Sequence, residues 1–302
     1  MNEQFTTAGR IVVGIDGSTQ SQVAIEWAAR RAIRDGVGLT LVLALAPLQV
    51  PNRTSVFRVL HEGIDFLAEV EKAGRKRLAV AEQETHARWP ELDLQAVLLR
   101  ETEPSVALVG ASADAHLVVT GTRGLGAVRG AALGSVSSHL VAHARGRVVI
   151  VPETGASDPA TPGLVVVGVD DAAQSAATLD AALDEATRAN GRVLAIHAWE
   201  YTPSSFVGVP EIDLGAFDDT RELLTAALDR FVGEHNSTVP VETRVEVGSA
   251  GAALVEASHE AELVVVGTRG RSGLSGLLLG STCREVVRRA LCPVLVVPAP
   301  RT

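Results

Sequence analysis

Two glycine-rich stretches hold the residues of this chain whose types and spacing point most clearly to chemistry. They cover residues 121–137 and 267–282, and each reads Gly-x2-Gly, nine further residues, then Gly-Ser. Glycine has no Cβ, so backbone N–H groups in such a stretch can approach an anion closely. The pattern therefore favours a cradle for a chain of phosphates. Its glycines are Gly121, Gly124 and Gly134 in the first copy and Gly267, Gly270 and Gly280 in the second.

The Gly-Ser step at the end of each stretch is predicted to begin a helix, at Ser135 and at Ser281. The first N–H groups of a helix have no intrahelical partner, and the positive end of the helix dipole favours a phosphate there. A second interpretation is a tight turn followed by a serine N-cap. Two copies at identical spacing, each after a buried strand, favour the phosphate site.

Two aspartates are predicted to lie at the same edge as the glycines. Asp16 follows the first apolar run of one half of the chain, and Asp170 follows the matching run of the other half. A carboxylate would repel a triphosphate, so these side chains are expected to face a ribose hydroxyl or a bound Mg²⁺. The alternative is a turn or capping role ahead of the next helix.

The elements that must position these residues occur twice, because the chain contains an internal repeat. VVGIDGSTQSQ near the start recurs as VVGVDDAAQSA, and HLVVTGTRG at 116–124 recurs as ELVVVGTRG at 262–270. Between the copies lies a segment rich in Pro, Gly, Ser and Thr, which is typical of a linker. The sequence therefore predicts two domains, 1–152 and 164–302, joined by the linker 153–163.

Each half alternates continuous Val/Ile/Leu runs with helical patterns, which predicts the order β-α-β-α-β-α-β-α-β. That order gives an α/β fold: two tandem Rossmann-like domains, each a five-stranded parallel sheet with helices on both faces. Ligands bind such sheets at the carboxyl ends of the strands, where both glycine motifs fall. Helices are predicted at about 18–35, 65–88, 103–114, 135–144, 173–190, 215–235, 250–260 and 281–291, and loops at 47–64 and 200–214.

Composition and charge argue against several classes of function. The net charge of −9 disfavours nucleic acid as a partner. No run approaches the roughly 18 apolar residues of a membrane span, and the start of the chain lacks the apolar core of a signal peptide, so a cytoplasmic protein is expected. Cys283 and Cys292 lack metal-type spacing and are expected to be inert thiols.

Signs of fast chemistry are missing from the sequence. There is no Gly-x4-Gly-Lys-[Ser/Thr] motif, no nucleophile elbow and no His-Glu-x-x-His, so no catalytic or metal residue is predicted. His139 and His143 are four residues apart but lack a third ligand, which favours a solvent-facing pair. Four arginines in the glycine stretches either pair with phosphate or are solvated: Arg123, Arg129, Arg269 and Arg271.

Taken together, these motifs resemble a tandem universal stress protein of the ATP-binding subclass, of the actinobacterial, mycobacterial kind. Gly-x2-Gly-x9-Gly-Ser is the nucleotide motif of that subclass, and VGIDGS at 13–18 and CPVLVVP at 292–298 resemble its first and last strands. The resemblance implies that adenine lies near the ends of the first two strands of each half. It implicates Asp16, Leu45, Thr120, Asp170, Ala198 and Val266 on the base side. For ribose and phosphates it implicates Gly121, Gly124, Gly134, Ser135, Val136, Gly267, Gly270, Gly280, Ser281 and Thr282.

The resemblance further implies ATP, with Mg²⁺, in each half, and a nucleotide-dependent regulator of stress response or dormancy with slow or no hydrolysis. It implies a homodimer, with the last strands at 147–151 and 293–297 pairing across halves. Asp171-Ala172 replaces Gly17-Ser18 in the second half, which predicts a weaker second site. Two alternatives stay open: an ATP-cleaving enzyme of the adenine-nucleotide α-hydrolase group, and a ligand-free interaction protein.

Overall fold

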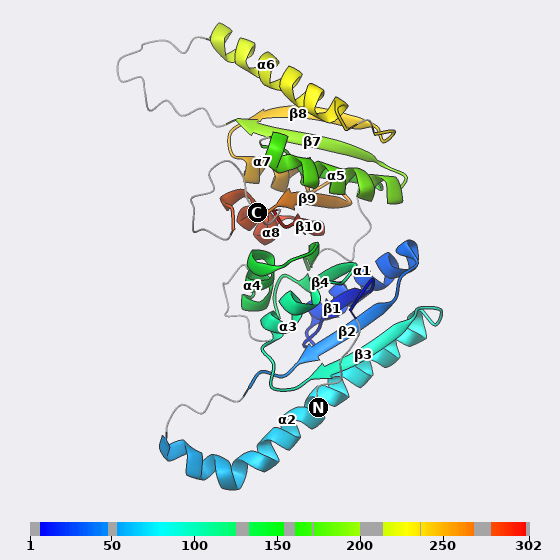
Figure 1. Ribbon diagram of the computed structural model, residues 1–302, viewed down its shortest axis with the longest axis vertical. Coiled ribbons are helices and arrows are strands. Elements are labelled where there is room, and N and C mark those ends of the chain that lie inside the picture. Colours follow the sequence, from blue (N-terminus) through cyan, green and yellow to red (C-terminus); the bar gives the residue numbers. More distant parts are fainter. Residues whose placement is uncertain are drawn as a thin grey trace. The chain divides into compact units, whose positions relative to one another are not determined.

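The computed structural model describes residues 7–47, 53–124, 133–153, 161–170, 172–199, 214–235, 237–268 and 279–299. The chain divides into two compact units, Met1–Ala156 and Ser157–Thr302. Strands and helices alternate along both units (Figure 1). No helix in the described part of the chain combines the length and the apolar character that crossing a membrane requires.

The first unit is a parallel sheet of five strands in the order β3-β2-β1-β4-β5. Strands β1, β2, β4 and β5 are mostly Val, Ile and Leu and are buried along nearly their whole length, as in a sheet covered on both faces, whereas the edge strand β3 is partly exposed. Its elements are β1 (Ile11–Gly14), α1 (Thr19–Asp35), β2 (Leu39–Ala44), α2 (Arg53–Arg88), β3 (Leu94–Leu99), α3 (Pro104–Ala111), β4 (Leu117–Gly121), α4 (Ser135–His143) and β5 (Val148–Val151).

The second unit repeats this topology in the order β8-β7-β6-β9-β10, again with parallel pairing. The predicted fold class, two tandem Rossmann-like domains, is therefore confirmed. The elements are β6 (Leu164–Gly168), α5 (Ala172–Arg188), β7 (Arg192–Trp199), α6 (Leu214–Gly233), β8 (Val241–Val247), α7 (Ala250–Ala257), β9 (Leu263–Gly267), α8 (Ser281–Arg289) and β10 (Val294–Val297).

The helices of the first unit form two layers over its sheet. Helix α1 packs on β1, β4 and β5 and contacts α2, whereas α3 packs on β1 and β2 and contacts α4. The central strand β1 lies between β2 and β4, so the chain leaves it in one direction and returns on its other side. The connections after β1 and β4 therefore diverge at the carboxyl edge of the sheet and leave a crevice there.

One predicted loop is wrong in its second part. The segment 47–64 was expected to be a loop, but α2 begins at Arg53 and extends past the sheet (Figure 1). Val56, Leu60 and Ile64 recur at intervals of four, which suits one face of a helix. A single glycine, Gly63, lowers helix propensity without ending the helix. The loop predicted at 200–214 falls almost entirely outside the described residues, and α6 begins at Leu214.

A buried ionic cluster ties the end of α1 to the start of β4. The Asp35 Oδ2 atom lies 2.6 Å from Arg31 Nε and 2.9 Å from His116 Nε2, and the side chains of Arg31 and Asp35 are 4% and 3% exposed. Burial alone would raise the pKa of the Asp35 carboxyl. The hydrogen bonds from Arg31 and His116 and the positive charge of Arg31 outweigh burial and lower that pKa.

We expect Asp35→Asn to destabilise the first unit by about 3 kcal/mol, because it removes the buried ion pair between Arg31 and Asp35. The lowered pKa means that the Asp35 carboxylate stabilises the fold fully above its unfolded pKa of about 3.9 and loses this effect as pH falls through the folded pKa. The acid limb of the variant's unfolding curve should therefore be flatter. Urea unfolding between pH 3 and 7 measures both effects.

The matched control is Asp93→Asn. The Asp93 carboxyl pairs with Arg10, which lowers its pKa, but its side chain is 68% exposed. Solvent screens such a pair, so a much smaller loss of stability is expected. Equal losses for the two variants would contradict the role assigned to burial around Asp35.

Candidate functional site

A cavity of about 350 Å³ opens at the carboxyl ends of β1, β2 and β4 in the first unit. Every residue that the sequence predicted for this half lines it, although these residues come from five separate segments of the chain. They are Asp16, Leu45, Thr120, Gly121, Gly124, Gly134, Ser135 and Val136. The topology thus brings the glycine motif, the aspartate and the end of β2 to one place.

The loops after β1 and β4 meet at Asp16 and Gly124. The Asp16 Oδ1 atom accepts a hydrogen bond of 2.9 Å from the backbone N–H of Ser18, which is the predicted turn role. The other carboxylate oxygen faces Gly124 so closely that a Cβ on residue 124 would collide with it. A side chain at residue 124 would therefore displace the Asp16 carboxylate, a packing reason for glycine beyond the predicted approach of a phosphate to its backbone.

Gln20, in the first turn of α1, braces the glycine loop. Its Oε1 atom accepts hydrogen bonds from Thr122 Oγ1 at 2.8 Å and from the backbone N–H of Arg123 at 2.7 Å. Its backbone carbonyl lies 3.1 Å from where a Cβ on Gly121 would stand, so the loop packs tightly against the helix. Sequence reasoning missed this residue, but a signal existed: Gln20 recurs as Gln174 in the repeat, and Thr122 recurs as Thr268.

The Gly-Ser steps begin helices in both units, as predicted. Helices α4 and α8 start at Ser135 and Ser281, with Gly134 and Gly280 as N-caps. Because the serines occupy the first helical position, they are not the N-caps that the alternative interpretation required. Neither glycine has a side chain that could accept hydrogen bonds from the N–H groups of the first turn. At the starts of α4 and α8 these N–H groups can therefore donate to a bound anion.

Matching backbone hydrogen bonds close the glycine stretch in both units. The Gly134 N–H donates to the Thr122 carbonyl at 2.7 Å, and the Gly280 N–H donates to the Thr268 carbonyl at 2.8 Å. In the first unit the buried Ser137 hydroxyl also donates to the Gly121 carbonyl at 2.7 Å. The residues on either side of the nine-residue insert are thus held together by the same contact twice.

The predicted residues of the second unit lie at the equivalent edge. Asp170 follows β6, Ala198 is on β7, Val266 and Gly267 end β9, and Gly280, Ser281 and Thr282 begin α8. The Asp170 N–H donates to Ser175 Oγ at 3.0 Å. Gly270 lies outside the described residues, as do Arg129, Arg269 and Arg271.

The register of the strands corrects one equivalence between the halves. The resemblance implicates Leu45 in the first half and Ala198 in the second as equivalent residues, but Gly14 pairs with Val42 and Gly168 pairs with Ile196, which makes Trp199 the counterpart of Leu45. Ala198 therefore corresponds to Ala44, which also lines the first cavity. A shift of one residue arises easily because two apolar strands of similar composition align almost equally well in either register.

Several other polar residues proved to be structural. The buried His197 is a satisfied histidine at the edge of the core, since its Nδ1 atom lies 2.9 Å from the Val169 carbonyl. His139 and His143 stack with ring centroids 4.0 Å apart. The described residues contain no cluster of three metal-type ligands.

Burial raises the pKa of the Cys283 and Cys292 thiols to about 12, so both stay protonated and inert near neutral pH.

Arg123 is the one glycine-loop arginine whose side chain the structure describes. It lines the cavity, and its Nη2 atom lies 3.6 Å from Glu153 Oε2. Both side chains are exposed, so this ion pair is weak and easily exchanged for another anion. Arg77 of α2, which sequence reasoning did not connect with the motif, lines the same cavity.

The repeated sheet with its cavity at the carboxyl edge defines a tandem α/β protein of the Rossmann-like class. The model of the universal stress protein family matches residues 7–152 and again 164–298, and the chain belongs to this family. A universal stress protein of Mycobacterium tuberculosis is 38% identical over 95% of both chains, and one of Mycolicibacterium smegmatis is 34% identical over 97% of this chain and 98% of its own.

A solved universal stress protein from Archaeoglobus fulgidus shares the fold. It covers 97% of this chain and 99% of its own with a TM-score of 0.66, at 18% sequence identity. At that identity the likeness concerns the fold alone.

We expect Gln20→Ala to loosen the loop between Gly121 and Gly124, because it removes the acceptor of the Arg123 N–H. Hydrogen exchange at the Arg123 amide should accelerate by about tenfold, the equivalent of about 1.4 kcal/mol. The control is Gln22→Ala, an exposed residue of the same helix for which the structure describes no side-chain hydrogen bond. Unchanged exchange in Gln20→Ala would show that the brace does not hold the loop.

Proposed function

We propose that each half of the chain binds ATP and that the protein acts as a nucleotide-dependent regulator in stress response or dormancy. The observation that carries this proposal is the cavity of the first unit, which gathers all eight predicted residues of that half. Its volume of about 350 Å³ lies within the range of small-molecule sites. Charge and geometry give the cavity two different ends.

The proposed phosphate end is formed by the glycine loop and the start of α4. First-turn N–H groups, the positive end of the helix dipole and the Ser135 hydroxyl all favour an anion at this end. The proposed base end is formed by Val42, Leu43, Ala44 and Leu45, an apolar strand end that suits a purine ring. Asp16 lies between these two ends and suits a ribose hydroxyl.

Mg²⁺ fits this arrangement only as a companion of the nucleotide. Asp16 is the single carboxylate among the lining residues, and Mg²⁺ is commonly held by one or two carboxylates together with substrate phosphates. Such an ion would neutralise phosphate charge near Asp16. The second unit is proposed to bind ATP in the same manner, more weakly because its base-side loop differs in sequence.

The lining residues favour a sensor over the alternative, an ATP-cleaving α-hydrolase. The charged side chains that line the described cavity are Asp16, Arg77 and Arg123. Asp16 is engaged with the Ser18 N–H and Gly124, and neither arginine is a general base. Slow hydrolysis or none is therefore expected. Turnover near 1 s⁻¹ with excess ATP and Mg²⁺, which is in the ordinary range for enzymes, would contradict this proposal.

Direct binding is tested by acid extraction of the freshly purified protein, followed by nucleotide chromatography and calorimetric titration with ATP. The proposal expects ATP in the extract, or two binding events per chain on titration. Absence of both would favour the ligand-free interaction protein. The homodimer and the cytoplasmic location are proposed with the regulator, and light scattering at high concentration tests the dimer.

We expect Gly124→Ala to weaken ATP binding in the first unit by about tenfold, because the new Cβ displaces the Asp16 carboxylate. Titration should show one of the two binding events weakened. Gly270→Ala should weaken the other event, on the sequence equivalence alone.

Gly110→Ala is the matched control for Gly124→Ala. Gly110 lies within α3, and a Cβ there would meet no atom within 4 Å, so ATP binding should be unchanged. Thermal unfolding would show that all three variants remain folded. If Gly124→Ala bound ATP as well as the control, the glycine loop would be only a turn.

A further inference from the structure

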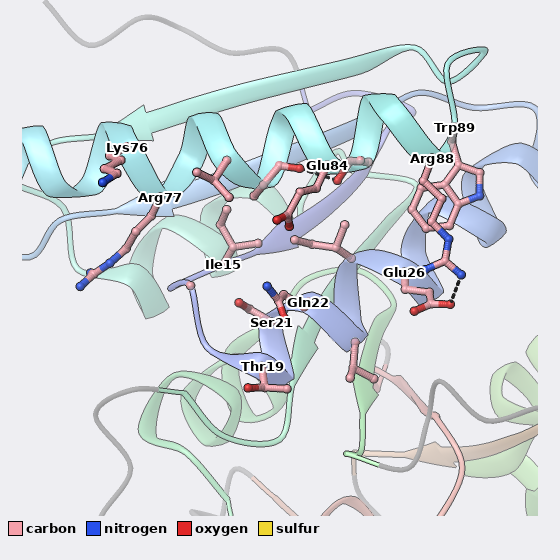
Figure 2. Close-up of a pocket in the computed structure, with 16 residues that line it drawn as sticks. Ile15, Thr19, Ser21, Gln22, Glu26, Lys76, Arg77, Glu84, Arg88 and Trp89 are labelled. Atoms are coloured by element: carbon pink, nitrogen blue, oxygen red, sulfur yellow. Dashed lines mark hydrogen bonds and ion pairs between the residues drawn. The ribbon is translucent and has the colours of Figure 1, made fainter.

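Helix α2 brings an arginine from outside the sequence motif to the proposed nucleotide cavity. Arg77 lines that cavity and also a second one, of about 520 Å³, which lies between α1 and α2. The two cavities share Ile15, Ser21 and Arg77, so Arg77 stands where they adjoin. Figure 2 shows its side chain extending from α2 toward the turn between Ile15 and Thr19.

Two glycines that neighbouring side chains approach closely, Gly17 and Gly74, place Arg77 beside the proposed base end of the cavity. Gly17 has φ +85°, and a Cβ on it would lie 3.1 Å from Arg77 Cδ, so the aliphatic part of the arginine rests on the turn that follows Asp16. One turn earlier in α2, a Cβ on Gly74 would lie 3.3 Å from Leu45 Cδ2. The helix therefore approaches the proposed purine site through Gly74 and Arg77.

The charge of Arg77 is available for a ligand. The side chain is exposed and has no hydrogen bond or ion pair within the described part of the chain. Arg75, two residues earlier, differs because it pairs with Glu71 at 2.8 Å. A guanidinium group is planar, weakly hydrated and able to stack on an aromatic face. An arginine with these properties beside an apolar strand end suits a flat aromatic ring.

We propose that Arg77 contacts the nucleobase in the first unit by stacking its guanidinium group on the purine ring. This inference rests on the proposed function and adds to it a residue that determines affinity for the base. It also explains how the site holds a base without an aromatic side chain, since none lines the described cavity. The residue is a binding residue and takes no part in hydrolysis.

The test titrates the full chain with adenosine, AMP and ATP. Because the contact is with the base, Arg77→Ala should weaken first-unit binding of all three ligands by the same factor, about 3- to 30-fold. Arg77→Lys keeps the charge but loses the planar group, so it should recover only part of the affinity. Arg75→Ala is the matched control on the same helix and should bind all three ligands normally.

A double variant assigns the effect to the first unit. The Gly124→Ala variant already has impaired binding in the first unit, so the event that remains strong on titration belongs to the second unit. Because Arg77 lies in the first unit, adding Arg77→Ala should leave that second-unit event unchanged. A loss that grows from adenosine to ATP would mean that Arg77 contacts phosphate and would overturn the proposal, as would no loss at all. Failure of the unmodified protein to bind any of the three ligands would instead overturn the proposed function, and this inference with it.

Discussion

The close approach of the Asp16 carboxylate to Gly124 is the constraint on which the site of the first unit depends. Parallel pairing of β1 with β4 places the ends of these strands side by side, and their connections then diverge. The two loops meet with Asp16 in its present position because residue 124 lacks a side chain at the contact. Gln20 fixes the same junction from α1, through its bonds to Thr122 and Arg123. Asp16 and the glycine loop after β4 are therefore positioned together.

The duplication repeats this scaffold while changing the residues around it. Both units close the glycine stretch with the same Gly-to-Thr backbone bond and begin the following helix at serine. They differ at the end of the second strand of each sheet: by strand register, His197 stands in the second unit where Leu43 stands in the first, and Trp199 where Leu45 stands. The closure of the glycine stretch is thus kept in both units, while the side chains at the end of the second strand of each sheet differ.

Much of the fold could be predicted because its signals are local. Continuous Val, Ile and Leu runs identify strands buried on both faces, and the glycine spacing identifies the loop after β4. The errors have physical causes as well. The helical prediction began at residue 65, although α2 begins at Arg53 and its first apolar residues recur at helical spacing. Leu45 was matched to the wrong residue of the second unit because neighbouring apolar positions on a strand differ little in sequence. Arg77 gave no local signal, since it lies more than forty residues from the glycine motif.

The sequence by itself determined the duplication, the parallel α/β architecture, the glycine motifs and the residue types that the carboxyl edge would carry. These depend on periodicity and on backbone conformations that particular residues favour, both of which are local properties. Only the tertiary structure decided which side chains touch: that Asp16 abuts Gly124, that Gln20 braces the loop, and that Arg77 reaches the cavity from α2. Those contacts follow from strand register and from the packing of α1 and α2 on the sheet, which no local stretch of sequence specifies.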